Sequence, residues 1–309
     1  MKNRVLFMGT PSFAVSILQV LLESGLDVVG VVTQPDKPVG RKQILTPSPI
    51  KKLALENSLS VYQPIKIKEL DQIIQDLNLD LIVTCAYGQF IPTSILEAPR
   101  FGSVNVHASL LPKYRGGAPI HKAIICGEKE SGVTLMRMVK QMDAGNIISS
   151  ITVEITQEDD VLSLHDKLSI AGALLLKDKL PDLLKEDVPS TVQDESKVTF
   201  AYNITPEEEF ISFKREVHVV YNHLRGLSPW PIGHGIIHGK KLKLIKAFMI
   251  EEDHQDPLGE FVAYEKGLKI ACLGGYVVVT VCQFEGKEKM DAAAFYNGLG
   301  KSLLHGIFE

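Results

Sequence analysis

Over residues 1–188, short apolar runs alternate with segments whose apolar side chains recur at helical spacing. Residues 4–9 are apolar and stop at a Gly-Thr-Pro sequence, which predicts a buried strand. Residues 12–24 carry a helical pattern that Gly25 ends, which predicts a helix. The same reasoning predicts strands at 28–33, 61–62, 79–86, 103–107 and 132–138, and helices at 49–56, 69–77 and 161–184.

This alternation of strands and helices predicts the fold class. Strands that are joined by helices pair in parallel through right-handed crossovers, so we expect an α/β fold with a doubly wound, mostly parallel, Rossmann-like sheet. Ligands bind such sheets beyond the carboxyl ends of the strands. Gly9, Thr33, Ala86 and His107 stand at those ends and should lie around one site.

The pattern changes after the predicted helix at 161–184. Residues 189–205 are polar and lack sustained periodicity, which is typical of a linker between domains. A predicted helix at 215–224 is followed by glycine-punctuated β-type runs, which suggest a small, OB-like barrel. We therefore expect one domain over residues 1–188 and a second over 206–309. The β-type runs lie at 235–238, 241–250, 259–263, 268–272 and 276–284.

Composition narrows the classes of function. The 309 residues are 45% hydrophobic and 23% charged, with a net charge of −4, so the chain does not resemble a protein that coats nucleic acid indiscriminately. A local basic patch remains compatible with this charge. No apolar stretch approaches the ~18–20 residues of a membrane span, and the N-terminus has no targeting signal. We expect a cytoplasmic protein without a membrane partner.

Cysteines and histidines show no spacing typical of a metal site. The four cysteines lie far apart in apolar runs, without a C-x-x-C pair, so we expect four buried, reduced thiols and no metal. They are Cys85, Cys126, Cys272 and Cys282.

Three polar residues suggest acyl transfer. Asn105 and His107 are two apart on a predicted strand, so their side chains share one face at its carboxyl end. Asp143 lies in a loop after the strand predicted at 132–138. A carboxylate can orient an imidazole, while the imidazole and the amide can stabilise an oxyanion during attack by an amine. Taken alone, the Asn-x-His pair would be better explained as satisfying a turn, but the long irregular loop that follows favours a site.

The string NVHASLLPKYRGGAP and the later DAGNI resemble the folate-dependent formyltransferases, with GTPSFA, QPDKPVGR and AYGQFIP adding to the match. Within this group the best fit is the methionyl-tRNA formyltransferase family, over nearly the whole chain. The resemblance implies that Asn105, His107 and Asp143 are catalytic and that 10-formyltetrahydrofolate donates the formyl group. It also implies that the folate is lined by Ser109, Leu110, Leu111 and Pro112 and by Ala86, Tyr87, Gly88, Gln89, Phe90 and Ile91.

The acceptor is suggested by a second feature, the loop at residues 34–48. It exceeds the common connection of about 2–6 residues and carries Lys37, Arg41 and Lys42. Without the resemblance this would be an ordinary solvated loop. The resemblance implies that it engages the acceptor stem of methionyl-initiator tRNA. Gln43 and Ile44 depart from relatives that carry further basic residues there, so an apolar wedge by Ile44 is conceivable.

The C-terminal half resembles the family's tRNA-binding domain, including the string RGLSPWP around the single tryptophan. Trp230 itself is better explained by packing at the domain edge. Lys241 and Lys243 share one face of a predicted strand, and we expect them to contact tRNA phosphates. A solvated face is the common explanation for such a run, and the domain is not basic overall.

Two alternatives stay open at this point. One is a formyltransferase for a small amine, such as an amino-sugar nucleotide or glycinamide ribonucleotide; the basic loop and the second domain disfavour it. The other is a non-catalytic folate- or tRNA-binding module, which the intact Asn105, His107 and Asp143 disfavour. We expect a monomeric enzyme. Either His107 or a water molecule could take the proton of the amine.

Overall fold

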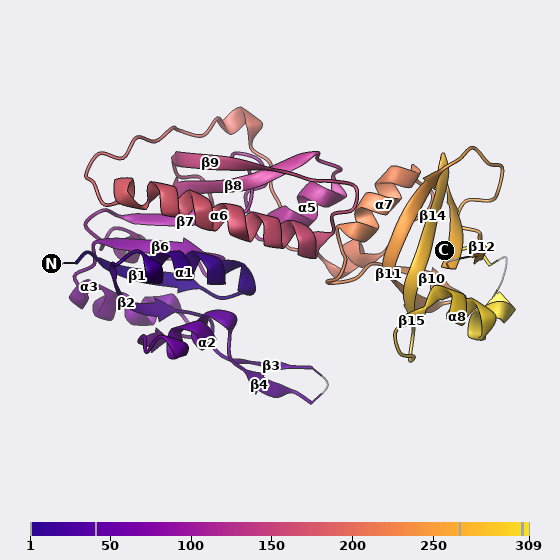
Figure 1. Ribbon diagram of the computed structural model, residues 1–309, viewed down its shortest axis with the longest axis horizontal. Coiled ribbons are helices and arrows are strands. Elements are labelled where there is room, and N and C mark those ends of the chain that lie inside the picture. Colours follow the sequence, from indigo (N-terminus) through magenta and orange to yellow (C-terminus); the bar gives the residue numbers. More distant parts are fainter. Residues whose placement is uncertain (1, 41, 266, 304–305, 309) are drawn as a thin grey trace. The chain divides into compact units, whose positions relative to one another are not determined.

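The computed structural model describes residues 2–40, 42–265, 267–303 and 306–308 (Figure 1). The chain forms two compact units, and each is built from more than one segment. Unit 1 comprises Met1–Pro119, Glu130–Glu154 and His165–Tyr202, and unit 2 comprises Ile120–Lys129, Ile155–Leu164 and Asn203–Glu309. The short segments at 120–129 and 155–164 were not anticipated, because their assignment depends on long-range contacts.

Unit 1 is built on a seven-stranded sheet with the order β5-β2-β1-β6-β7-β8-β9. The first five of these strands run parallel, and β7–β8 and β8–β9 pair antiparallel. The α/β class is confirmed, with an antiparallel edge added to the parallel sheet. The strands are β1 Arg4–Gly9, β2 Asp27–Val32, β5 Val61–Tyr62, β6 Leu81–Cys85, β7 Ser103–His107, β8 Glu130–Arg137 and β9 Ile147–Glu154.

Helices cover both faces of this sheet. On one face α6 approaches β7 closely, because a Cβ added at Gly172 would lie 3.1 Å from Val106. On the other face α3 and α4 cover an apolar cluster that includes Leu6 and Met8 of β1. The helices of this part of the chain are η1 Ser12–Ala14, α1 Val15–Glu23, α2 Pro49–Glu56, η2 Ile67–Leu70, α3 Asp71–Asp76, α4 Thr93–Leu96, α5 Pro119–Ile125, α6 Val161–Leu183 and η3 Glu195–Lys197.

Hydrogen bonds join the loops at the carboxyl ends of β1, β2 and β6. The Thr10 hydroxyl donates to the Tyr87 carbonyl at 3.1 Å and accepts the Gln34 amide at 3.3 Å. The side chain of Gln34 donates to the same Tyr87 carbonyl at 3.2 Å. The strand order reverses between β1 and β6, and a doubly wound sheet binds its ligands at this point.

The loop predicted at residues 34–48 contains a hairpin of β3 Lys37–Val39 and β4 Ile44–Thr46, which projects from unit 1 (Figure 1). Its base is anchored by Lys51, which donates to Asp36 at 2.7 Å. This bond lowers the pKa of Asp36 below its ordinary value. The hairpin was predicted only as a loop, because its exposed strands carry no burial pattern that a sequence could display.

Unit 2 contains a six-stranded antiparallel sheet with the path β10-β11-β14-β13-β12, and β15 pairs with β14. Helix α7 places Val217, Val220 and Leu224 in the apolar core of this unit. The expected β-rich second half is thereby confirmed. Its elements are η4 Pro206–Glu209, α7 Val217–Arg225, β10 His234–Ile237, β11 Lys240–Glu251, β12 Phe261–Tyr264, β13 Gly267–Cys272, β14 Gly275–Phe284, β15 Met290–Asp291, α8 Ala292–Asn297 and η5 Leu299–Leu303.

Unit 2 holds a buried histidine that should make its stability depend on pH. His223 Nε2–H donates to the Glu208 carbonyl at 2.8 Å, and Nδ1 accepts from Arg215 at 2.7 Å. Burial lowers the pKa of His223 below its ordinary value, and the neighbouring Arg215 adds to this effect. Neutral His223 therefore contributes fully to the stability of unit 2 above the ordinary His pKa of about 6.5. This contribution is lost as the pH falls below that value, because the unfolded chain binds the proton more readily than the folded one.

As the pH is lowered, we expect the free energy of unfolding of unit 2 to decrease by up to about 1.4 kcal/mol per pH unit because of His223 alone. Urea unfolding followed by Trp230 fluorescence between pH 7.5 and 5 measures it. His223→Gln should show a shallower dependence, and equal slopes for the two proteins would refute the assignment.

Two further sequence predictions concern burial and membranes. Cys85, Cys272 and Cys282 are buried as expected, but Cys126 is exposed, so its prediction was wrong. It directly follows the end of α5, at the end of the apolar run that suggested its burial. Among the described residues, no helix combines the length and the apolar character that crossing a membrane would require.

Candidate active site

Asn105 and His107 project from β7, which lies inside the sheet between parallel β6 and antiparallel β8. Ladders on both sides fix the backbone of β7, and alternation along the strand puts both side chains on one face. His107 is buried, with 7% of its surface exposed, and Asn105 is half-buried. The strand therefore presents an amide and an imidazole from a rigid support.

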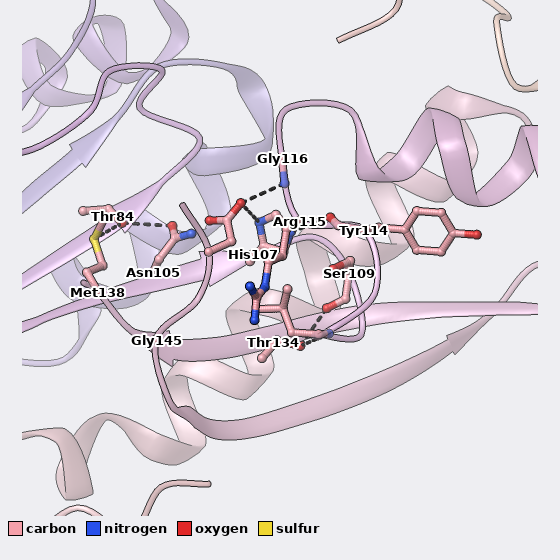
Figure 2. A network of polar contacts seen from close by, with 12 residues as sticks. Thr84, Asn105, His107, Ser109, Tyr114, Arg115, Gly116, Thr134, Met138 and Gly145 are labelled. Carbon is pink, nitrogen blue, oxygen red and sulfur yellow. Dashed lines mark hydrogen bonds and ion pairs between the residues drawn. The ribbon is translucent and has the colours of Figure 1, made fainter. Parts of the chain in front are cut away.

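The loop between β8 and β9 brings Asp143 to His107. Asp143 Oδ2 lies 3.7 Å from His107 Nδ1 and accepts the Gly116 amide at 2.9 Å (Figure 2). Asp143 adopts a positive φ of 49°, a conformation that Asp tolerates better than most residues. Its side chain is 16% exposed, so water screens its charge only in part. The structure thus brings together the three residues predicted to be catalytic.

The second ring nitrogen of His107 defines the tautomer. Nε2 lies 3.0 Å from the Tyr114 carbonyl oxygen, which can only accept, so Nε2 carries a proton (Figure 2). Nδ1 then faces the Asp143 carboxylate. At 3.7 Å the two are too far apart for a direct hydrogen bond but close enough for strong electrostatic attraction once Nδ1 is protonated.

Asn105 is oriented by Thr84 of β6, a residue that sequence reasoning missed. The Thr84 hydroxyl lies 2.9 Å from Asn105 Oδ1, and the two residues are paired in the β6–β7 register. Because Oδ1 faces this hydroxyl, the Nδ2 amino group is the end left to donate toward a ligand. Only the register of the sheet reveals this contact, so no local sequence signal could have identified it.

The loop that follows β7 is fastened to β8. Thr134 donates from its hydroxyl to the Ser109 carbonyl at 2.7 Å and accepts the Leu111 amide at 3.1 Å. Ser109 donates to the Lys113 carbonyl at 2.7 Å. Ser109 and Leu111 are buried, whereas Leu110 and Pro112 are half-buried. Of the residues predicted to line the folate site, Ser109 thus holds the loop in shape through its hydroxyl and Leu111 through its backbone amide.

The segment Ala86–Ile91, predicted to contact the folate, alternates in exposure. Ala86, Gly88 and Phe90 are exposed, and Tyr87 and Ile91 are buried. Ala86 adopts a positive φ of 48° and turns the chain out of β6. Ala86 and Gly88 therefore offer mostly backbone to a ligand, whereas Phe90 exposes its aromatic ring by 76%.

Two further side chains of this segment are directed elsewhere. Gln89 accepts the Ile67 amide at 2.9 Å and so ties the segment to η2. Tyr87 has a buried hydroxyl without a hydrogen-bond partner among the described residues. Burial raises the pKa of Tyr87 to about 12. This phenol is therefore neutral near pH 7 and is not a candidate base.

Those residues predicted to bind tRNA that the structure describes lie on exposed surfaces. Lys37 and Lys42 are exposed on the hairpin, and Arg41 lies outside the described residues. The same hairpin exposes Val39, Ile44 and Leu45 by 56%, 61% and 65%.

Lys241 and Lys243 in unit 2 are likewise exposed on one face of β11, with Leu242 and Leu244 buried on the other, as the alternation predicted. In the described part of the chain, no three His, Cys, Asp or Glu side chains gather as a metal-binding group.

Two family models together match most of this chain. Residues 1–180 match the family model described as formyl transferase, and residues 203–300 match the formyl transferase C-terminal domain. The chain belongs to the formyl transferase family.

Among the relatives of this formyltransferase is a methionyl-tRNA formyltransferase of Listeria monocytogenes, 48% identical over 305 residues and 97% of each chain. Another, from Staphylococcus epidermidis, is 46% identical over 307 residues and 98% of each chain. A solved N-formyltransferase from Helicobacter canadensis aligns with a TM-score of 0.69 at 21% identity, covering 90% of this chain and 99% of the other. The last similarity concerns the fold alone.

Proposed function

We infer that this enzyme transfers the formyl group of 10-formyltetrahydrofolate to the amino group of methionyl-initiator tRNA. The observation that carries this inference is the near-complete match, at 46–48% identity, to methionyl-tRNA formyltransferases. The convergence of Asn105, His107 and Asp143 at the carboxyl end of β7 supplies the chemistry that such a transfer needs. We also propose that it acts as a monomer in the cytoplasm, where it supports translation initiation.

In the proposed mechanism the methionyl amine attacks the formyl carbon. A carbon–nitrogen bond forms, and the carbonyl electrons move to oxygen. The Nε2–H of His107 and the Nδ2 of Asn105 donate to this oxyanion. Nε2–H now donates to the Tyr114 carbonyl, so the formyl oxygen has to replace that carbonyl as the acceptor. The bond to the folate nitrogen then breaks, the amine loses a proton and the folate nitrogen gains one.

Asp143 contributes charge and orientation to this step. A proton that reaches Nδ1 creates an imidazolium, which the carboxylate stabilises from 3.7 Å. The same oxygen, Oδ2, accepts the Gly116 amide, and this hydrogen bond helps to hold the carboxylate in place. We propose that Asp143 acts through His107 and not as a nucleophile.

The folate is proposed to lie between the loop after β7 and the segment after β6. Ser109, Leu110, Leu111 and Pro112 border it on one side, and Ala86–Ile91 borders it on the other. Support comes from the strand-order reversal beside β6 and from the outward-facing backbone at Ala86 and Gly88.

The hairpin of β3 and β4 is proposed to bind the tRNA. Its lysines, Lys37 and Lys42, supply positive charge for phosphates, together with Arg41. Its exposed apolar residues, Ile44 among them, suit contact with unpaired bases near the acceptor end. Lys241 and Lys243 of unit 2 form a second proposed phosphate contact.

Replacing the two lysines of the hairpin tests the identity of the acceptor. Lys37→Ala with Lys42→Ala should raise KM for charged tRNA several-fold and leave KM for formyl-folate within about twofold, because only the tRNA carries phosphates for these lysines. The dependence of log(kcat/KM) on log[salt] should become shallower by about 0.7–0.9 per lost contact.

The matched control is Lys177→Ala, an exposed lysine on α6 outside the hairpin. It should change neither the tRNA KM nor the salt dependence. An unchanged tRNA KM in the hairpin variant would remove these two lysines from the tRNA contact.

A further inference from the structure

Residues 189–202, which form most of the linker predicted at 189–205, bind both loops of the catalytic centre. Thr191 exchanges two backbone hydrogen bonds of 2.8 Å with Ile147, just after the Asp143 loop. Thr199 accepts the Arg115 amide at 2.9 Å and, through its hydroxyl, the Tyr114 amide at 2.9 Å. Ala201 donates to the Arg115 carbonyl at 2.7 Å. We call residues 189–202 the strap.

One side chain of the strap reaches between the two loops. Gln193 is 5% exposed, and its Nε2 donates to the carbonyls of Asp143 and Gly145, each at 2.8 Å. Its Oε1 accepts from Arg115 at 3.1 and 2.8 Å. The side-chain amide thus uses two donor contacts on the Asp143 loop and two acceptor contacts on the loop after β7.

Arg115 is placed by this amide and by one carboxylate. It is 1% exposed, and its guanidinium also donates to Glu195 at 2.7 and 3.4 Å. A buried guanidinium requires a counter-charge and filled hydrogen bonds, and Glu195 and Gln193 supply both. Arg115 stands between Tyr114, whose carbonyl binds His107, and Gly116, whose amide binds Asp143.

The Asp143 loop is a tight turn whose backbone is held by contacts from the strap. Asp143 has a positive φ, and a Cβ at Gly145 would lie 1.8 Å from the Arg137 carbonyl oxygen. Within the described part of the chain, the carboxylate accepts one hydrogen bond, from the Gly116 amide, which sets its distance from His107. The amide of Gln193 holds the backbone on both sides of residue 144 and so fixes where the Asp143 side chain begins.

We propose that Gln193 and Arg115 are positioning residues that hold the Asp143 carboxylate against His107. Neither touches the reacting atoms; they act through the Asp143 backbone and the Gly116 amide. This inference rests on the proposed formyl transfer and extends it to a segment outside the catalytic strand. On this proposal, the strap contributes to the geometry of the active site.

Gln193→Glu is the sharpest test, because it keeps the size and the acceptor for Arg115 and removes both donors to the Asp143 loop. We expect kcat to fall about 10- to 100-fold, as small misplacements at a reacting centre do, with KM for formyl-folate and tRNA within about twofold. Val192→Ala, at a neighbouring side chain that is 76% exposed, is the matched control and should leave kcat unchanged.

A double-mutant cycle separates positioning from a general structural role. If Gln193 acts through Asp143, Gln193→Glu should cost little further kcat in an Asp143→Asn background. If Gln193 only supports the fold, the reductions in kcat caused by Gln193→Glu and Asp143→Asn should multiply in the double variant. Multiplying losses, or a single variant within twofold of wild-type kcat, would overturn the proposal.

Glu195→Gln tests the same chain of contacts from the surface, should Gln193→Glu not fold. Its side chain is 68% exposed, so the core is left intact, and kcat should fall several-fold at constant KM. An unchanged kcat would overturn the role of Arg115. Each variant is compared with the wild type on the acceptor that the wild type uses. A wild type inactive on charged tRNA would therefore contradict the proposed function and not this inference.

Discussion

His107→Ala should lower the turnover of formyl transfer by at least about a thousandfold. The change removes the Nε2–H donor, and loss of one oxyanion donor typically costs 10²–10³ in kcat. It also removes the Nδ1 that faces Asp143, and with it any acid–base contribution, typically 10²–10⁴-fold. Single-turnover formylation of charged tRNA at saturating formyl-folate measures the loss.

The fold should survive this substitution, because the ladders of β7 to β6 and β8 do not depend on the His107 side chain. Circular dichroism and the unfolding midpoint check this. His218→Ala, at an exposed histidine on α7, is the matched control and should turn over normally. Turnover near the wild-type rate in a folded His107→Ala protein would contradict the assignment.

Asp143→Asn should lower kcat by about 10²- to 10³-fold with little change in KM, because an amide cannot stabilise the imidazolium. Asn keeps the size of Asp and an oxygen for the Gly116 amide, so the substitution isolates the charge from the geometry. Steady-state kinetics in both substrates separates kcat from KM.

A matched acid for this comparison lies on α6. Asp178 is 70% exposed, and Asp178→Asn should behave as wild type. If Asp143→Asn changes only KM, or keeps kcat within threefold, Asp143 does not support the imidazolium.

The elements of the sheet were predictable where burial leaves a local pattern. Strands β1, β5 and β7 and helix α2 have the predicted bounds, because apolar runs and terminal signals sit within each segment. The hairpin and β9 were missed. The hairpin is exposed throughout, and β9 alternates half-buried and exposed residues at the sheet edge, so neither has an apolar run.

The active site was predictable in its residue types but not in its geometry. Asn105 and His107 follow from alternation on one strand, and Asp143 from its position and the family resemblance. The contacts of Thr84 with Asn105 and of Gln193 with the Asp143 loop join distant parts of the chain. Such contacts depend on the register of the sheet strands and on the conformation of the loops, and no local sequence pattern encodes them. A polar segment with the composition of a linker gives no sign that its one glutamine, Gln193, is buried.

The central claim is that the acceptor is methionyl-initiator tRNA. Its most direct test is the rate of formyl transfer from 10-formyltetrahydrofolate to charged initiator tRNA, charged elongator tRNA, an amino-sugar nucleotide and glycinamide ribonucleotide, each under the same conditions. We predict rapid formylation of the charged initiator tRNA, weaker formylation of the elongator and none of either small amine. Formylation of a small amine alone, with charged initiator tRNA left unmodified, would contradict the account.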